Sequence, residues 1–185
     1  AVIVSTPNAT HYPITMEALS KGLHVLCEKP IALTYAQADA MASEAERRGV
    51  VHMTAFTYTF FPYYRYIAHL INEGYIGEPR HFNFRYFSAS GLGQASGWRF
   101  NRPQAGEGAL ADIGSHGLSL ALQCFGEITG IGALLSTHVQ RGHIPPENRA
   151  SDEALLMLRF ANGAAGSVHV SMVSPQPTGG GQTQG

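Results

Sequence analysis

Hydrophobic and polar positions follow two different patterns along this chain, and the pattern changes near residue 55. Before it, apolar runs at 1–5, 24–27 and 50–54 have the length of buried strands. Between them, 10–21 and 34–48 carry apolar residues at helical spacing. Strand, helix, strand, helix, strand with short joints is typical of half of a doubly wound parallel sheet, so we expect an α/β unit here.

Single residues mark the ends of the two expected helices. Gly22 follows the first helix, in the position where a glycine commonly ends a helix. Thr34 and Gln37 have the spacing of a capping box at the start of the second helix, and Gly49 follows its last turn.

After residue 55 the pattern predicts a second region of different architecture. The aromatic-rich stretch 56–66 leads into a helix that closes at 72–74, and 81–87 alternates with the period of a half-buried strand. A glycine-led helix is expected over 106–125 and a strand over 128–139.

A hairpin completes this second region. The runs 154–160 and 165–173 flank Asn162-Gly163, which is a strong signal for a tight hairpin turn. We therefore expect an α+β domain whose sheet is mostly antiparallel, with helices on one face.

The patterns divide the chain into three parts. Residues 1–55 form the partial parallel sheet and 56–173 the α+β domain, whereas 174–185 are rich in Pro, Gly and Gln and are expected to be disordered. At Ala1–Val4 a strand is already under way and no methionine precedes it, so we expect the chain to be incomplete at its N-terminus.

Composition and charge narrow the class of protein. With 44% hydrophobic and 14% charged residues, the 185-residue chain is expected to be globular. A net charge of −1 without a Lys/Arg run argues against nucleic acid or an anionic membrane as partner, and no apolar run is long enough to span a bilayer. Cys27 and Cys124 lack metal-ligand spacing, which predicts free thiols in a reducing cytoplasm.

The first candidate for chemistry is Glu28-Lys29-Pro30 at the end of the second strand. Open α/β sheets bind ligands at the carboxyl ends of their strands, and Pro30 stiffens the backbone that carries Lys29. A positioned lysine suits proton transfer. The alternative is an ordinary surface Glu–Lys pair.

The second candidate is Asp112-Ile113-Gly114-Ser115-His116, in which Asp112 and His116 stand four apart on an expected helix and share a face. The pair is open to four interpretations: an acid and base acting on a hydroxyl, a capping arrangement, a metal half-site, or a structural histidine. No third ligand appears at informative spacing, so no metal site is predicted.

Two glycine clusters carry weaker signals. Gly91 to Gly97 follows a strand, but its spacing departs from G-x-G-x-x-G and no helix pattern follows, so we expect a loop near the substrate instead of a phosphate site. Gly106-Glu107-Gly108 is either an anion-binding helix entry or a simple turn.

Three segments together resemble the Gfo/Idh/MocA oxidoreductases: Ser5-Thr6-Pro7-Asn8 with His11, Glu28-Lys29-Pro30, and Gly108 to His116. The similarity runs from residue 1 to about 173. It implies the second half of a Rossmann domain that binds NAD or NADP. It also implies an α+β domain with an open-faced sheet that often forms dimers or tetramers. By the resemblance, the glycine fingerprint and the residue that selects NAD or NADP would both precede Ala1.

The resemblance also implies roles for particular residues. Lys29 would be the catalytic or substrate-orienting lysine, His116 the acid/base on a substrate hydroxyl, and Asp112 would hold both substrate and histidine. The residues that would contact the cofactor are Thr6, Pro7, Asn8, His11, Glu28, Trp98 and Arg99. The chain departs from many relatives at Thr59, where arginine is common, and at Ser119, where aspartate is common.

We therefore expect an NAD(P)-dependent oxidoreductase of the cytoplasm that acts on a sugar, polyol or related compound. As given, the chain is expected to bind NAD(P)H poorly and to lack turnover, because the pyrophosphate-binding glycines are absent. One alternative is a sugar- or nucleotide-sensing protein on the same fold. Another is a metal-dependent hydrolase or isomerase that uses Asp112 and His116.

Overall fold

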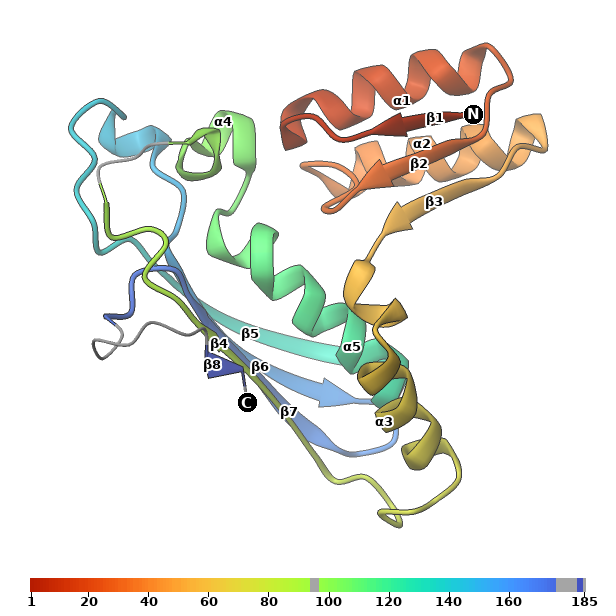
Figure 1. Cartoon of the computed structure of the whole chain (residues 1–185), viewed down its shortest axis with the longest axis vertical. Coiled ribbons are helices and arrows are strands. Elements are labelled where there is room, and N and C mark those ends of the chain that lie inside the picture. The colour runs from red at the N-terminus through yellow and green to blue at the C-terminus, as the bar shows by residue number, and fades with distance from the viewer. Residues whose placement is uncertain (94–96, 176–182, 185) are drawn as a thin grey trace.

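Two β-sheets with separate cores make up the chain (Figure 1). The computed structural model describes residues 1–93, 97–175 and 183–184. In the first sheet, strands β1 (Val2–Val4), β2 (Val25–Glu28) and β3 (His52–Ala55) run parallel in that order. The parallel sheet expected before residue 55 is confirmed.

Both helices of this unit pack against one face of its sheet. Helices α1 (His11–Ser20) and α2 (Tyr35–Arg48) contact each other, and their apolar side chains enclose Val25 and Cys27 of β2. The opposite face is open, because Ile3 of β1 is 72% exposed.

The expected ends of α2 are also confirmed. Oγ1 of Thr34 accepts a hydrogen bond from the backbone N–H of Gln37 (3.3 Å), which satisfies one of the free donors at the helix start. Gly49 has φ of 64°, the left-handed conformation that glycine adopts without a Cβ clash.

The second sheet is larger and mixed. Its order is β5 (Ile128–Ser136), β6 (Glu153–Phe160), β7 (Ala165–Ser171), β4 (His81–Phe87) and β8 (Thr183–Gln184). All neighbours are antiparallel except β4 and β7, which are parallel. The hairpin expected at Asn162-Gly163 joins β6 to β7, and the amide of Ala164 donates to Oδ1 of Asn162.

Helices α3 (Pro62–Asn72) and α5 (Ser115–Phe125) cover one face of this sheet (Figure 1). The close approach of α5 requires Gly117, because a Cβ there would lie 2.7 Å from Cδ1 of Phe84. On β6 the alternation is strict: Leu156 and Leu158 are buried under the helices, whereas Leu155 and Met157 face outward.

Two expectations need correction. The helix expected over 106–125 begins only at residue 109 and is not α-helical throughout, because Leu110–Gly114 forms a π-helical turn that runs directly into α5 at Ser115. Its start is held from outside, where the N–H of Ala109 donates to O of Ser151 (2.8 Å). Residues 183–184, within the tail expected to be disordered, form β8 beside β4; residues 176–182 and 185 lie outside the described residues.

Short helical segments make the remaining connections. The 3-10 turn Thr57–Phe60 joins β3 to α3, and Trp98–Phe100 precedes helix α4 (Arg102–Ala105). Further 3-10 turns lie at Asn8–Thr10 and Pro146–Asn148. Within the described part of the chain, no helix is both long enough and apolar enough to cross a membrane.

Candidate active site

A cleft of about 380 Å³ lies where the ends of β1 and β2 meet the second region. It brings together most residues that the sequence singled out, from four separate parts of the chain. Its lining residues are Ser5, Thr6, Pro7, Asn8, Glu28, Lys29, Trp98, Arg99 and Asp112. The position agrees with the rule that open α/β sheets bind ligands at the carboxyl ends of their strands.

Lys29 is held by Asp112 across this cleft. Its Nζ lies 2.6 Å from Oδ1 of Asp112 and also donates to the backbone oxygen of Asp112 at 2.5 Å. Both side chains are largely buried, with 14% and 22% of their surface exposed. The ammonium is therefore a fixed group, and a surface Glu–Lys pair is not what the structure shows.

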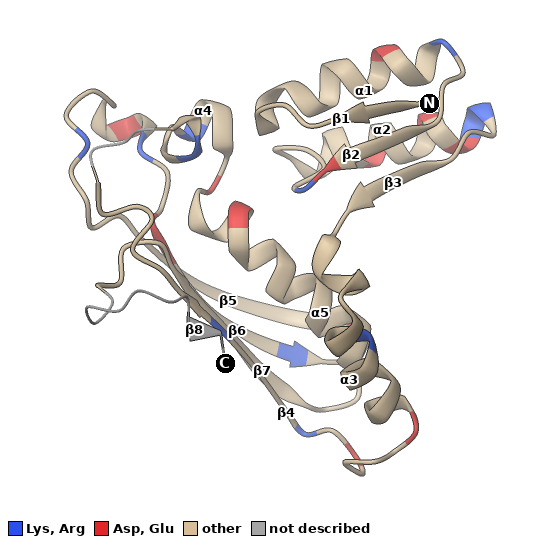
Figure 2. Ribbon diagram, in the orientation of Figure 1, with Lys and Arg blue, Asp and Glu red and all other residues tan. Residues whose placement is uncertain are grey.

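Asp112 lies between two cations. Its second oxygen, Oδ2, is 3.6 Å from Nε of Arg99. Arg99 is more exposed and stacks over the ring of Trp98, with 4.6 Å from Cζ to the ring centroid. Figure 2 shows this charge arrangement from the side: acidic and basic positions meet at the end of β2, opposite an acidic position just before α5.

His116 lies behind the cleft and is not among the residues that line it. It is 5% exposed, and its buried Nδ1 has no hydrogen-bond partner among the described residues. Burial lowers the pKa of His116 to about 4, with help from the positive charge of Lys29 and against the opposing effect of Asp112. The imidazole is therefore neutral at physiological pH.

His11 is placed differently from the expectation that it contacts a ligand. It is fully buried and does not line the cleft. Its Nδ1 lies 2.8 Å from O of Pro30 and its Nε2 2.9 Å from O of Thr6. His11 thus ties together the two turns that follow β1 and β2 and form one wall of the cleft.

Asn8 connects the two regions of the protein. It is 5% exposed, and its Nδ2 donates to O of Ala105 in α4 (2.9 Å). The amide group is therefore partly occupied by a structural contact, although Asn8 also borders the cleft.

A buried ion pair that the sequence did not reveal anchors the loop carrying Trp98 and Arg99. Arg141 is 1% exposed and lies 3.2 Å from Oδ2 of the fully buried Asp152. Its guanidinium also covers the ring of Phe100 at 3.7 Å from Cζ to the centroid. No local pattern marks Arg141, because its partners are distant in sequence.

The glycines of the two clusters have structural roles. The N–H of Gly91 donates to O of Met172 (2.6 Å), and its carbonyl accepts from Nη2 of Arg141 (2.8 Å), so this amide is not free to hold phosphate. Residues 94–96 of the same loop lie outside the described residues. Gly108 has φ of 52°, and a Cβ there would lie 2.0 Å from O of Ser151.

The structure shows no metal-binding group of three in the part of the chain it describes, counting His, Cys, Asp and Glu. What the site offers is a fixed ammonium, a carboxylate that orients it, and a neutral imidazole with an unpartnered nitrogen. This set can bind a hydroxyl-bearing compound and exchange a proton with it.

The chain matches two family models along most of its length. Residues 1–56 match an oxidoreductase family with an NAD-binding Rossmann fold, and residues 64–183 match the GFO/IDH/MocA C-terminal domain. Levoglucosan dehydrogenase of Pseudarthrobacter phenanthrenivorans is 34% identical over 92% of this chain and 48% of the relative. A scyllo-inositol 2-dehydrogenase (NADP(+)) of Bacillus subtilis is 34% identical over 75% of this chain and 44% of its own length.

The comparison with solved structures agrees with the family matches. Levoglucosan dehydrogenase in complex with NADH and levoglucosan has a TM-score of 0.85 and 35% identity, over 94% of this chain and 48% of the other. An inositol dehydrogenase homolog complexed with NAD+ from Azotobacter vinelandii has a TM-score of 0.85 and 28% identity, over 99% and 47%. The chain spans about half the length of the curated relatives it matches.

Proposed function

We propose that this chain, which belongs to the Gfo/Idh/MocA family of oxidoreductases, takes part in hydride transfer between NAD or NADP and a hydroxyl-bearing carbon of a sugar or polyol. The observation that carries the proposal is the cleft at the ends of β1 and β2, where Lys29 and Asp112 are paired in front of His116. The class of reaction is inferred from the dehydrogenases of the family, and the role of each residue is inferred from its side chain.

The residues of the cleft fit the nicotinamide end of such a cofactor. Thr6, Pro7, Glu28 and Trp98 border the strand ends, where a planar ring and a ribose would meet hydroxyl, carboxylate and aromatic groups. The unpartnered Nδ1 of His116 marks a buried polar atom without a protein partner, as expected where substrate binds. When bound, the nicotinamide accepts or returns the hydride.

The chain's own residues handle the proton. A carbinol carbon releases hydride only as its O–H proton is taken up. His116, neutral because its pKa is lowered to about 4, can accept that proton at physiological pH. Lys29, fixed by Asp112, donates a hydrogen bond to the same oxygen and stabilises its developing negative charge.

The test, like every assay of turnover or NADH binding below, uses the protein extended at its N-terminus by the family's glycine fingerprint. It is assayed with NAD or NADP and a panel of sugars and polyols, following formation of the reduced nicotinamide. We expect substrate-dependent reduction whose rate falls as the pH drops through the pKa of His116. His116→Asn should remove that limb. Sugar binding without turnover under any condition would contradict the proposal and favour a sensing protein.

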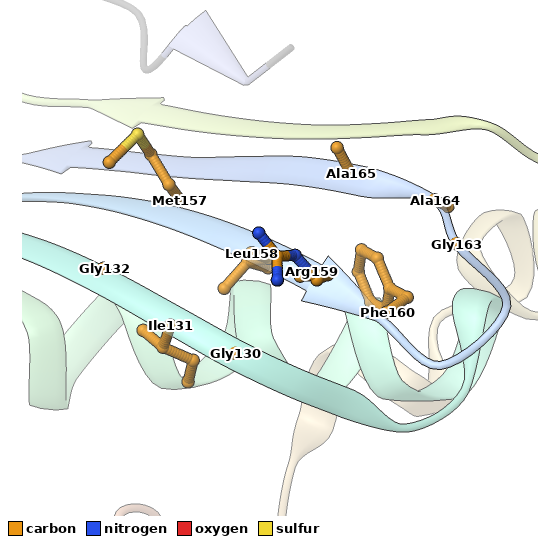
Figure 3. Close-up of a pocket in the computed structure, with 10 residues that line it drawn as sticks. All are labelled: Gly130, Ile131, Gly132, Met157, Leu158, Arg159, Phe160, Gly163, Ala164 and Ala165. Atoms are coloured by element: carbon orange, nitrogen blue, oxygen red, sulfur yellow. The ribbon is translucent and has the colours of Figure 1, made fainter.

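We further propose that a second copy of the chain packs on the open face of the larger sheet. Figure 3 shows part of this face, where Met157 and Arg159 stand out from β6. Met157 is 68% exposed, and on the same face Leu134 of β5, which pairs with Leu155 of β6, is 64% exposed, forming an apolar stripe that monomeric proteins rarely leave uncovered. Met157→Glu should shift the protein to monomer in light-scattering measurements; an unchanged mass would count against this face.

A further inference from the structure

We propose that Tyr58 is a positioning residue for His116: its ring lies flat against the imidazole and fixes the plane in which His116 meets the substrate hydroxyl. This inference rests on the proposed function. Tyr58 belongs to the 3-10 turn after β3, whereas His116 is in the first turn of α5. The contact therefore joins the connection between the two sheets to the acid/base group.

The geometry is that of a stacked pair. The centroids of the two rings are 4.0 Å apart and their planes differ by 13°. Phe56 closes the arrangement with its ring nearly perpendicular to the imidazole, at 6.1 Å and 81°. Rotation of the imidazole out of its plane would drive it into Tyr58, so only the two orientations related by a ring flip remain open to it.

Tyr58 is itself held from behind. Its ring stacks with Tyr64 at 5.8 Å and 14°, and with Phe61 at 5.4 Å and 28°. Because Phe61 is the N-cap residue of α3 and Tyr64 lies in its first turn, the helix supports the whole aromatic stack. A ring with packed neighbours behind it can resist displacement, which a lone exposed tyrosine could not.

The surroundings favour stacking as the role of Tyr58 over acid/base chemistry. Burial raises the pKa of Tyr58 to about 12, with smaller effects of Tyr86, Tyr64, Tyr63 and Asp112. The phenol is therefore neutral across the working range of pH. The charged groups that act on His116 are Lys29 and Asp112, and neither belongs to the stack. The aromatic face, and not the hydroxyl, is the part of Tyr58 that the inference requires.

Nuclear magnetic resonance of the whole chain tests the contact without any assay of activity. A stacked tyrosine shifts the ring protons of His116 upfield through its ring current. We expect that shift to disappear in Tyr58→Leu, to persist in Tyr58→Phe, and to be unaffected in the control Tyr75→Leu, where the tyrosine is 77% exposed. An unchanged His116 spectrum in folded Tyr58→Leu would overturn the proposal.

Kinetics then test the positioning. We expect Tyr58→Leu to lower kcat about tenfold or more while KM stays within a few-fold, because a misplaced catalytic group costs rate and not binding. The pH at which the rate falls should change together with the pKa of His116 in the same variant. Tyr58→Phe should restore both kcat and the pH profile. A lost ring-current shift with unchanged kcat and pH profile would overturn the proposal.

The two claims fail separately. If wild-type protein oxidises no sugar or polyol, the proposed function is wrong. The resonance data then decide whether Tyr58 sets the plane of His116. If Tyr58→Leu does not fold, Tyr58→Phe still tests the stack, because its His116 ring protons must keep their upfield shift.

Discussion

Nζ of Lys29 lies 2.6 Å from Oδ1 of Asp112, and this ion pair joins residues 83 positions apart in the chain. Lys29 follows the central strand of the smaller sheet, and Asp112 lies in the turn that leads into the helix above the larger sheet. The pair thus bridges the two halves of the protein at the cleft. Any ligand bound there lies beside charges supplied by both halves.

Replacing Lys29 should affect the chemical step more than cofactor binding. We expect Lys29→Ala to lower kcat by on the order of 10² to 10⁴, because the loss of an acid–base or oxyanion-stabilising group has effects of this size. NADH affinity, measured by fluorescence titration, should change only a few-fold. Lys21→Ala, which removes an exposed lysine paired with Glu17, is the matched control. Near-normal kcat in Lys29→Ala would refute the role.

The lowered pKa of His116 should appear in the pH dependence of stability. Above pH 6.5 the imidazole is neutral in the folded and unfolded chain, so it contributes no pH dependence. As the pH falls from 6.5 to about 4, only the unfolded chain takes up the proton, and stability decreases. The loss should reach on the order of 3 kcal/mol and then level off.

Urea denaturation at a series of pH values measures this effect. His116→Asn cannot take up the proton, so its stability should decrease less between pH 6.5 and 4 than that of the wild type. Parallel curves for the two proteins would show that the pKa of His116 is not lowered in the folded chain.

The buried pair of Arg141 and Asp152 should stabilise the fold only as a pair. Arg141→Met leaves the carboxylate of Asp152 buried without its cation, and we expect a loss of about 3–5 kcal/mol in the free energy of unfolding. The double variant Arg141→Met/Asp152→Asn should recover part of that loss, because the unpaired charge is gone. Arg85→Met, at an exposed position of β4, is the control. Additive losses in the double variant would contradict the coupling.

His11 should stabilise both the fold and the wall of the cleft. Its two nitrogens face the carbonyl oxygens of Pro30 and Thr6, so His11→Leu removes the ring N–H from a partly buried acceptor. We expect a cost of about 1–3 kcal/mol and weaker NADH binding, because the two strand-end turns lose their link. Thermal unfolding and NADH titration are the measurements, with His143→Leu at an exposed loop position as control. Unchanged NADH affinity would show that the wall does not depend on His11.

The parts of the fold that local patterns encode were predictable from the sequence. Strand and helix periods placed both sheets, and single residues such as Thr34, Gly49 and Gly163 placed caps and turns, because each acts on its own neighbours. The cleft itself followed from the strand-end position of Glu28 and Lys29. These features depend on interactions within a few residues.

Features that depend on distant partners could not be predicted. Helical periodicity does not distinguish an α-helix from the π-helical turn around Asp112, whose start is held by Ser151. The aromatic-rich stretch after β3 gave no sign that Tyr58 would stack on His116, and Arg141 carried no local pattern at all. Such contacts arise only when the chain is folded.

The π-helical turn at Leu110–Gly114 also has a genetic consequence. The N–H of Ser115 donates to O of Leu110, five residues back, so the turn holds one residue more than an α-helical turn. An in-frame deletion of the single codon for Ile113 would let a regular helix run into α5 and would turn Asp112 by about 100° relative to it. The helix could keep its packing on the sheet, while the carboxylate would no longer face Lys29. The register of this turn, more than the stability of the helix, keeps the two charges together.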